Sequence, residues 1–260
     1  MPRIDYDDIA HLYDEPGRDH GVDTNLLAFC RERGTTPAAN ASVLDIGCGT
    51  GKQLAGDHEH LPVARLLGID RFGGMLRIAQ KRCPAAAWIQ ADGAALPLAT
   101  ESVDYASSQF SYPHIRRTRE LLEEVFRVLK AGGRFVMTNI DPWSMPGWLV
   151  YRYFPQAQEL DQQDFVPIDR FLTLLGEIGF LRARVSRTDL SRNERLDEFL
   201  AYVSDRHRAS QLLAIPDAAY QNGLKRLEEA VALSGSGAVA KSEFVVVTIM
   251  ADKPSLKEAA

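Results

Sequence analysis

Glycines at every second position follow an apolar run that ends near an aspartate: residues 43–51 read Val-Leu-Asp-Ile-Gly-Cys-Gly-Thr-Gly. Glycine adopts the backbone conformations of a tight turn and, having no side chain, lets a ligand approach the main chain closely. A helix that begins after such a turn points its free N–H groups at that ligand. We therefore predict that Asp45, Gly47 and Gly49 form a ligand-binding turn, in which Asp45 helps to order the chain.

The spacing of these glycines disfavours two common nucleotide-binding motifs. A dinucleotide fingerprint needs glycine at offsets 0, 2 and 5, but counting from Gly47 or Gly49 places Lys52 or Leu54 at the last position. A phosphate loop needs a glycine where this chain has Ile46. Nicotinamide, flavin, ATP and GTP are therefore disfavoured as ligands of this turn.

Two further carboxylates stand after the next apolar runs. Asp70 closes the run Gly-Ile-Asp, and Asp92 lies in Ala-Asp-Gly. A carboxylate at the end of the second strand can accept hydrogen bonds from both ribose hydroxyls of a nucleoside. The alternative is that each aspartate only caps the helix that follows, since aspartate is a favoured N-cap residue.

In this order, the motifs resemble those of the class I S-adenosylmethionine-dependent methyltransferases, and specifically the branch that contains ubiquinone and menaquinone biosynthesis enzymes and many small-molecule methyltransferases. Residues 96–98, 102–104 and 124–133 also match the family, so that the resemblance covers residues 41–140. The alternative is an ordinary glycine turn of an α/β protein, since motif matches carry a false-positive risk.

The resemblance implies S-adenosylmethionine as the cofactor and S-adenosylhomocysteine as the product. It assigns Asp70 to the ribose and Asp92 to the adenine amino group, and it leaves Met75 and Phe72 to pack on the adenine ring. The expected cofactor-binding residues are Tyr13, Arg18, Asp45, Gly47, Gly49, Asp70, Arg71, Met75, Asp92, Gly93, Ser108 and Gln109.

Residues 6–14, Tyr-Asp-Asp-Ile-Ala-His-Leu-Tyr-Asp, resemble the lid segment of the family, in which tyrosines close over the methionine end of the cofactor. Arg18 is expected either to form a bidentate hydrogen bond with the cofactor carboxylate or to be a solvated surface charge, because a Pro-Gly pair before it departs from the family's pattern. Tyr6 and His114 are the expected catalytic residues, with His114 as the best-placed general base. The alternative for His114 is a role in starting or packing a helix.

Methyl transfer from a sulfonium is an in-line displacement, for which a protein mainly orients and desolvates the reactants. Acceptor ligands are expected beyond the carboxyl ends of the strands, and the predicted ones are Asn139, Trp143 and Tyr151. The loop after the fourth strand lacks the Asn/Asp-Pro-Pro-aromatic tetrad by which related enzymes methylate amino groups of nucleobases or glutamine. The aromatic residues within 143–165 indicate a partly apolar or aromatic small molecule, or else form a satellite core under a long loop.

The predicted function is therefore S-adenosylmethionine-dependent methyl transfer to a small-molecule acceptor. Two alternatives stay open: an enzyme that transfers or cyclises the aminobutyryl group of the cofactor and releases methylthioadenosine, and a non-catalytic module that binds S-adenosylmethionine. The chain has 35 Asp and Glu against 30 Lys and Arg, which disfavours an RNA methyltransferase, and no nucleic-acid partner is expected.

Composition sets the remaining expectations. The 260 residues, 45% of them hydrophobic, suit one elaborated domain, and no apolar run reaches the roughly 20 residues that a membrane span needs. The N-terminus lacks the basic and apolar blocks of a signal peptide, so a cytoplasmic protein is expected, with a homodimer as the base-rate oligomer. The run His58-Glu59-His60 has no third ligand nearby, and no metal is predicted.

Apolar runs alternate with helical patterns between residues 41 and 140, which predicts an α/β fold with a parallel sheet. By resemblance, the fold is a Rossmann-like, mainly parallel seven-stranded sheet with an antiparallel last strand and helices on both faces. Strands are predicted at residues 42–46, 65–69, 86–90, 103–107, 134–139, 182–188 and 244–250. Helices are predicted at residues 118–130, 167–178 and 217–233.

The whole chain, residues 1–260, is expected to form one methyltransferase domain. Its parts are N-terminal lid helices (1–41), a cofactor-binding core (42–140), an aromatic insertion (141–166) and a helical cap insertion (191–237). Prolines are expected to make the aromatic insertion irregular. Ser191 and Glu194 are predicted to form a capping box that opens a helix.

Overall fold

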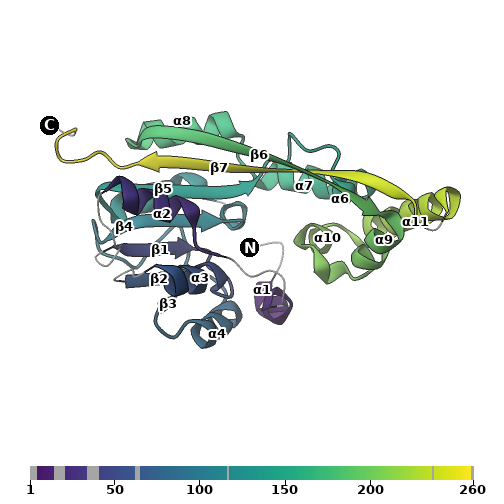
Figure 1. Cartoon of the computed structure of the whole chain (residues 1–260), viewed down its shortest axis with the longest axis horizontal. Helices are drawn as coiled ribbons and strands as arrows, with labels where there is room; N and C mark the ends of the chain where they lie inside the picture. The colour runs from purple at the N-terminus through teal and green to yellow at the C-terminus, as the bar shows by residue number, and fades with distance from the viewer. Residues whose placement is uncertain are drawn as a thin grey trace. The chain divides into compact units, whose positions relative to one another are not determined.

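Seven strands form one sheet in the order β3-β2-β1-β4-β5-β7-β6 (Figure 1). The structure, a computed structural model, describes residues 5–14, 21–33, 41–61, 65–115, 117–235 and 237–258. The strands are β1 Ser42–Ile46, β2 Arg65–Asp70, β3 Ala87–Gln90, β4 Val103–Gln109, β5 Leu129–Ile140, β6 Leu181–Arg195 and β7 Val239–Asp252.

Helices connect and flank these strands. The α-helices are α1 Tyr6–Ile9, α2 Thr24–Glu32, α3 Lys52–His60, α4 Gly73–Arg82, α5 Thr118–Val128, α6 Leu149–Tyr153, α7 Pro155–Asp164, α8 Ile168–Ile178, α9 Leu196–Ser204, α10 Ser210–Ala214 and α11 Asp217–Ser234. The 3-10 helices are η1 Ala10–Asp14, η2 Tyr112–His114 and η3 Arg206–Arg208. Among the helices of the described segments, none is long and apolar enough to cross a membrane.

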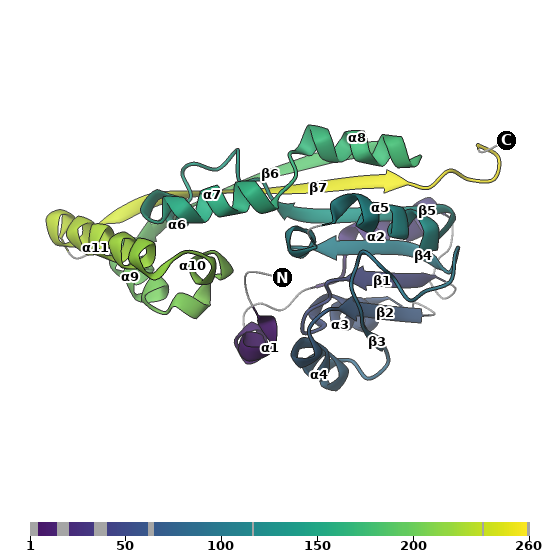
Figure 2. The same cartoon turned by 180° about the vertical axis from the view of Figure 1, so that it is seen from behind.

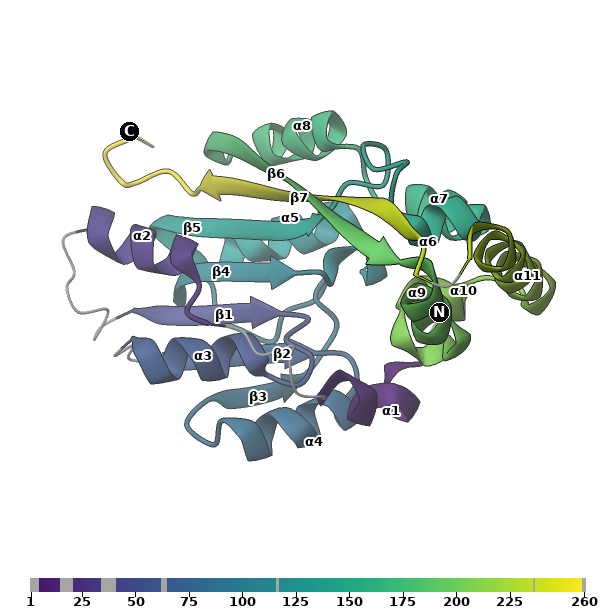
Figure 3. The same ribbon diagram turned by 45° about the vertical axis from the view of Figure 1, so that its right-hand side comes forward.

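The sheet is mainly parallel, as predicted. β1 pairs in parallel with β2 and β4, β2 with β3, and β4 with β5, whereas β7 runs antiparallel to β1 and β4 (Figure 3). The register places Ile46 beside Ile69 and Asp45 beside Ser107. The carboxyl ends of β1, β2 and β4 therefore meet at one edge, where the glycine turn begins.

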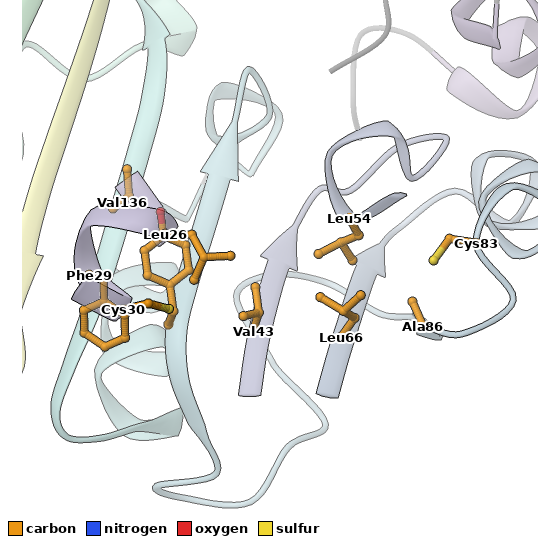
Figure 4. Close-up of a cluster of buried hydrophobic side chains, with 10 residues drawn as sticks. Leu26, Phe29, Cys30, Val43, Leu54, Leu66, Cys83, Ala86 and Val136 are labelled. Atoms are coloured by element: carbon orange, nitrogen blue, oxygen red, sulfur yellow. The ribbon is translucent and has the colours of Figure 1, made fainter. Parts of the chain in front are cut away.

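The core lies between the sheet and its covering helices. β1 and β2 are buried along nearly their whole length, as expected for parallel strands covered on both faces. α2 and α3 lie on one face of the sheet and α5 on the other (Figures 1 and 2). On the first face, side chains of α2, α3 and the first two strands pack together (Figure 4): Leu26, Phe29, Val43, Leu54 and Leu66. Full burial of such a side chain is worth about 1.5–3 kcal/mol.

The helix predicted at residues 118–130 ends at Val128, and the prediction was wrong for its last two residues. Leu129 is extended and pairs with Val103, and the register of β4 and β5 shifts beyond this pair. Gly132 has φ of +74°, and a Cβ at Gly133 would lie 3.0 Å from the Asp104 carbonyl oxygen. The sequence pattern predicts that the two glycines end a helix. In the structure they form an irregularity inside the longer strand β5.

The described residues fall into two compact units. The core unit comprises residues 5–139, 167–186 and 248–258, and the insertion unit comprises residues 140–166 and 187–247. β6 and β7 contribute residues to both units. The predicted core, 42–140, falls almost entirely in the core unit, and both predicted insertions fall almost entirely in the insertion unit; the single-domain organisation stays a prediction.

The insertion unit corrects two expectations about local structure. The aromatic insertion is helical rather than irregular: Pro155 begins α7, where a missing N–H costs nothing, and the Phe154 N–H donates to Val150 O at the end of α6. Ser191 and Glu194 form no helix start, because β6 continues through Arg195 and α9 begins at the next residue. Pairing of β6 with β7 in the sheet outweighs the capping-box pattern.

Candidate functional site

The glycine turn is attached to the end of β2. The N–H groups of Gly47 and Cys48 both donate to Ile69 O, at 2.7 and 3.1 Å. Gly47 and Gly49 have φ of +72° and +53°, in a region of backbone conformation that residues other than glycine rarely adopt. The predicted turn is therefore present, and its backbone conformation explains the glycines.

Asp70 joins the glycine turn to the loop after β2. Its buried carboxylate accepts hydrogen bonds from the N–H of Gly49, at 2.8 Å, and from the N–H of Phe72, at 2.9 Å. Burial raises the pKa of Asp70, although hydrogen bonds from the backbone of Phe72, Gly49 and Arg71 oppose the shift. An ionised carboxylate has about four acceptor positions, so Asp70 retains acceptor capacity for a ligand hydroxyl.

The surroundings of Gly47 and Gly49 differ. A Cβ at Gly47 would lie 2.3 Å from Ser111 Cβ, whereas a Cβ at Gly49 would meet no heavy atom within 4 Å. Gly47 is thus required by the protein itself, and the side of the turn at Gly49 stays open next to Asp70. A buried carboxylate beside an open main-chain turn fits a cofactor that carries a nucleoside.

Asp45 connects β1 to β4. The Ser107 hydroxyl donates to Asp45 Oδ1 at 3.1 Å, and both side chains are buried. Burial raises the pKa of Asp45 to about 7, with the Ser107 hydrogen bond opposing this rise. Asp45 accordingly links β1 to β4 just before the turn, and its role in ordering the turn stays a prediction.

Two serines link β4 and the loop after it to the end of β1. The Ser111 hydroxyl donates to Ile46 O, and it lies 2.8 Å from the Ser108 hydroxyl. Ser108 is fully buried, and Gln109 is half-buried at the end of β4. Ser111 therefore holds the turn at the carboxyl end of β1, whereas cofactor contacts of Ser108 and Gln109 stay predictions.

Asp92 stands at the carboxyl end of β3 with partners on both oxygens. The Ala94 N–H donates to Oδ1 and the Arg117 guanidinium to Oδ2, each at 2.9 Å. Burial raises the pKa of Asp92, but these two donors outweigh it and hold the pKa below its usual range. A Cβ at Gly93 would lie 2.7 Å from Ile115 Cδ1, so this loop packs tightly. No helix begins directly after Asp92, so its bond to the Ala94 N–H orders a turn rather than capping a helix, and the adenine contact stays a prediction.

Tyr6 and His114, far apart in sequence, meet in the core unit. The Tyr6 hydroxyl lies 3.2 Å from His114 Nε2, and their ring centroids are 5.3 Å apart. Tyr6 also contacts the rings of Tyr13 and Phe72, at centroid distances of 5.5 and 5.3 Å. The structure therefore brings both predicted catalytic residues and one predicted lid tyrosine into one aromatic cluster.

The remaining predicted residues of the core unit lie in other elements or outside the described residues. Met75 is buried in α4, and the Arg71 carbonyl accepts from Gln90. Asn139 is buried at the end of the core unit's part of β5. Arg18 lies outside the described residues.

Two predicted acceptor ligands belong to the insertion unit. Trp143 is 41% exposed, and its backbone N–H donates to Asp141 Oδ1. Tyr151 is buried, and its hydroxyl donates to Asp161 Oδ2 at 2.6 Å. Burial raises the pKa of Tyr151. A buried, hydrogen-bonded tyrosine is a packing residue in this unit, so contact with an acceptor stays a prediction for both residues.

Four residues of the site make contacts that single-sequence reasoning did not identify. Ser107 and Ser111 are ordinary serines in sequence, and Arg117 is one arginine of a charged helix start. Asp7, whose carboxylate accepts from the Gly74 N–H, lay inside the lid motif without an assigned role. The glycine at residue 47 was the available signal: it indicated a turn with close approach to the backbone, but it did not identify Ser111 as the neighbour.

Comparisons with known proteins agree with this geometry. A family model described as a methyltransferase domain matches residues 44–137. The chain is 27% identical to the malonyl-[acyl-carrier protein] O-methyltransferase of Methylococcus capsulatus, over 96% of this chain and 90% of that protein. It is 30% identical to a ubiquinone/menaquinone biosynthesis C-methyltransferase of Syntrophotalea carbinolica, over 69% of this chain and 85% of that protein.

A solved structure shares the fold. Phosphoethanolamine N-methyltransferase 2 of Haemonchus contortus, in complex with phosphomonomethylethanolamine and S-adenosylhomocysteine, aligns with a TM-score of 0.60 and 18% sequence identity. The alignment covers 96% of this chain and 58% of that chain. At this identity, the likeness shows a common fold.

Proposed function

This chain belongs to the class I S-adenosylmethionine-dependent methyltransferases, and we propose that it methylates a small molecule whose acceptor atom carries a proton before transfer. The observation that carries the proposal is the Tyr6–His114 pair, in which a hydroxyl and an imidazole nitrogen lie 3.2 Å apart. A carboxylate or thiolate acceptor needs no base, whereas a hydroxyl or an acidic carbon does.

The cofactor-binding residues lie in the core unit. When bound, S-adenosylmethionine supplies a methyl group already activated by its sulfonium. Asp70 would accept from the ribose while it keeps the N–H bonds of Gly49 and Phe72. Asp92, beside Arg117, would accept from the adenine amino group, and the glycine turn and the lid tyrosines would complete the site.

The catalytic pair moves one proton. The Tyr6 hydroxyl donates to the lone pair of His114 Nε2, which requires the tautomer with the proton on Nδ1. As the methyl group arrives, the acceptor's proton passes to Tyr6 Oη and the Tyr6 proton passes to His114 Nε2. The imidazole thus ends as a cation, and Tyr6 remains neutral. Orientation by the protein adds its own share of rate, up to about 7–11 kcal/mol of barrier.

The acceptor class follows from the relatives together with the aromatic residues. One relative is named for C-methylation, a reaction that suits an acidic carbon. The malonyl group in the name of the other relative, an O-methyltransferase, offers a carboxylate, which needs no base. The exposed Trp143 offers an aromatic surface in the insertion unit. We therefore propose an acceptor with a hydroxyl or an acidic carbon on a partly apolar or aromatic skeleton.

Product analysis tests this function. The purified protein is incubated with S-[methyl-13C]adenosylmethionine and a metabolite panel that includes phenols, quinols and acyl thioesters. The expected result is S-adenosylhomocysteine together with one labelled product whose 13C shift identifies an O-methyl or C-methyl group. Methylthioadenosine would indicate transfer of the aminobutyryl group instead, and cofactor binding without any product would favour a non-catalytic module; either result would overturn the proposal.

Asp70→Ala is expected to weaken S-adenosylhomocysteine binding about 10- to 150-fold. A hydrogen bond to a charged acceptor contributes about 1.5–3 kcal/mol, and each 1.4 kcal/mol is about tenfold in affinity. Isothermal titration calorimetry measures the dissociation constant. The matched control is Asp57→Asn, because Asp57 is a buried aspartate of α3 that accepts from the Asp23 N–H away from the turn. An Asp70→Ala protein with wild-type affinity would remove Asp70 from the ribose site.

A further inference from the structure

α1 and α4 are joined by a hydrogen bond that supplies a missing helix cap. The Gly74 N–H, in the first turn of α4, donates to Asp7 Oδ1 on α1. Phe72, at the N-cap position of α4, makes no side-chain capping hydrogen bond. Aspartate is among the best capping acceptors, and its negative charge suits the positive end of a helix dipole. Asp7 thus provides from α1 the cap that α4 lacks.

Gly74 allows the close approach on which this contact depends. A Cβ at Gly74 would lie 2.7 Å from Asp7 Oδ1 and 3.1 Å from both Asp7 Cα and the Asp7 carbonyl oxygen. At Gly73, the nearest atom to an added Cβ is Gln90 Oε1, at 3.2 Å and at the end of a flexible side chain. Of this glycine pair, Gly74 is the one against which the α1 backbone docks.

The contact between Asp7 and Gly74 bears on the position of Tyr6, the preceding residue of α1. α1 spans four residues, too few to be stable as an isolated helix, so its position depends on tertiary contacts. Tyr6 precedes Asp7, packs its ring against Phe72 at the start of α4, and places its hydroxyl 3.2 Å from His114 Nε2. The Asp7 N–H donates to Asp5 Oδ1 at 3.0 Å, which caps α1 as well.

We propose that Asp7 is a positioning residue, which holds the Tyr6 hydroxyl against His114 by capping α4 from α1. Without this acceptor, the hydrogen bond from the α4 backbone to α1 is lost, and Tyr6 samples positions away from Nε2. The inference rests on the proposed function in that Tyr6 and His114 are taken as the catalytic pair. The docking itself requires no turnover and is measured without it.

The 15N signals of the His114 imidazole, assigned with His114→Asn, report the hydrogen bond to Nε2 in the full chain. Tyr6→Phe defines the signal of His114 without that bond. Asp7→Ala is expected to move the signal most of the way to the Tyr6→Phe position and to raise amide exchange in residues 6–13 about tenfold. Asp7→Asn keeps an oxygen for the Gly74 N–H and is expected to retain the wild-type signal.

Two glycine variants test the contact from the side of α4. Gly74→Ala is expected to give the Asp7→Ala spectrum, and Gly73→Ala the wild-type one, with circular dichroism checking the fold of each. The double variant Asp7→Ala/Gly74→Ala should exceed neither single variant by more than about twofold in exchange, because both changes break one contact. A wild-type His114 signal in both Asp7→Ala and Gly74→Ala would overturn the proposal.

The outcomes separate this inference from the proposed function. A His114 signal that Tyr6→Phe leaves unchanged would contradict the Tyr6–His114 pair and, with it, the role of Asp7. A wild-type protein that shows the expected spectral coupling but methylates no acceptor would contradict the proposed function alone.

Discussion

Replacing His114 with asparagine is expected to lower kcat for methyl transfer by about 10²–10⁴-fold, the usual contribution of a positioned general base. The His114 Nε2 lies 3.2 Å from Tyr6 Oη, and an asparagine amide cannot take up the proton that leaves the acceptor. Because His114 has no predicted contact with ribose or adenine, the dissociation constant of S-adenosylhomocysteine should change by less than about threefold. Steady-state kinetics with the identified acceptor, and calorimetry with S-adenosylhomocysteine, measure the two quantities.

The pH dependence provides the discriminating control for His114. A general base must be unprotonated to act, so kcat of the wild-type enzyme should fall at acidic pH, and this acid limb of the profile should disappear in His114→Asn. The matched variant is His60→Asn, since His60 lies in α3 with its Nδ1 hydrogen-bonded to Gly56 O; its kcat should stay within about twofold of wild type. A His114→Asn enzyme with wild-type kcat would show that the acceptor needs no base.

Gly47→Ala and Gly49→Ala are expected to fail in different ways. A Cβ at Gly47 would overlap Ser111 Cβ at 2.3 Å, and φ is +72° there. Overpacking costs about 1–3 kcal/mol, and the left-handed conformation costs about 1–2 kcal/mol for a residue with a Cβ. Gly47→Ala should therefore lower the free energy of unfolding by several kcal/mol, which urea denaturation measures.

At Gly49, an added Cβ would meet no heavy atom within 4 Å. Gly49→Ala therefore carries the cost of the left-handed backbone conformation but no overpacking cost. Gly49→Ala should cost about 1–2 kcal/mol of stability. It should also weaken S-adenosylhomocysteine binding about tenfold or more, because the methyl group enters the space beside Asp70. The two variants thus separate stability from affinity.

A compensating substitution checks the cause at Gly47. Ser111→Gly removes the atoms that an alanine at this position would meet, so the double variant Gly47→Ala/Ser111→Gly should regain the packing part of the loss, although the Ser111 hydrogen bond to Ile46 O is absent. If Gly47→Ala and Gly49→Ala lose equal stability, the Ser111 contact does not determine the requirement for glycine at residue 47.

Local pattern was sufficient for the parts of the fold whose determinants lie within a few residues. β1 and β2 were predicted to within one residue, because short apolar runs flanked by turn residues are typical of strands buried on both faces of a parallel sheet. The predicted carboxyl end of α5 and the predicted start of α9 were wrong, since pairing with a distant strand overrode the helical pattern at Leu129 and the capping box at Ser191. Local propensity is weaker than such a tertiary contact.

The sequence by itself determined the glycine turn, the carboxylates after β2 and β3, and the family, because each depends on a short motif whose spacing the chain carries. Only the tertiary structure decided that Tyr6 meets His114, that Ser111 fills the place of a side chain at Gly47, and that Asp7 caps α4. These residues are joined through space by a hydrogen bond or a close packing contact, and neither leaves a periodicity in the chain. A linear pattern identifies what a backbone segment needs, whereas the folded arrangement identifies which distant residue supplies it.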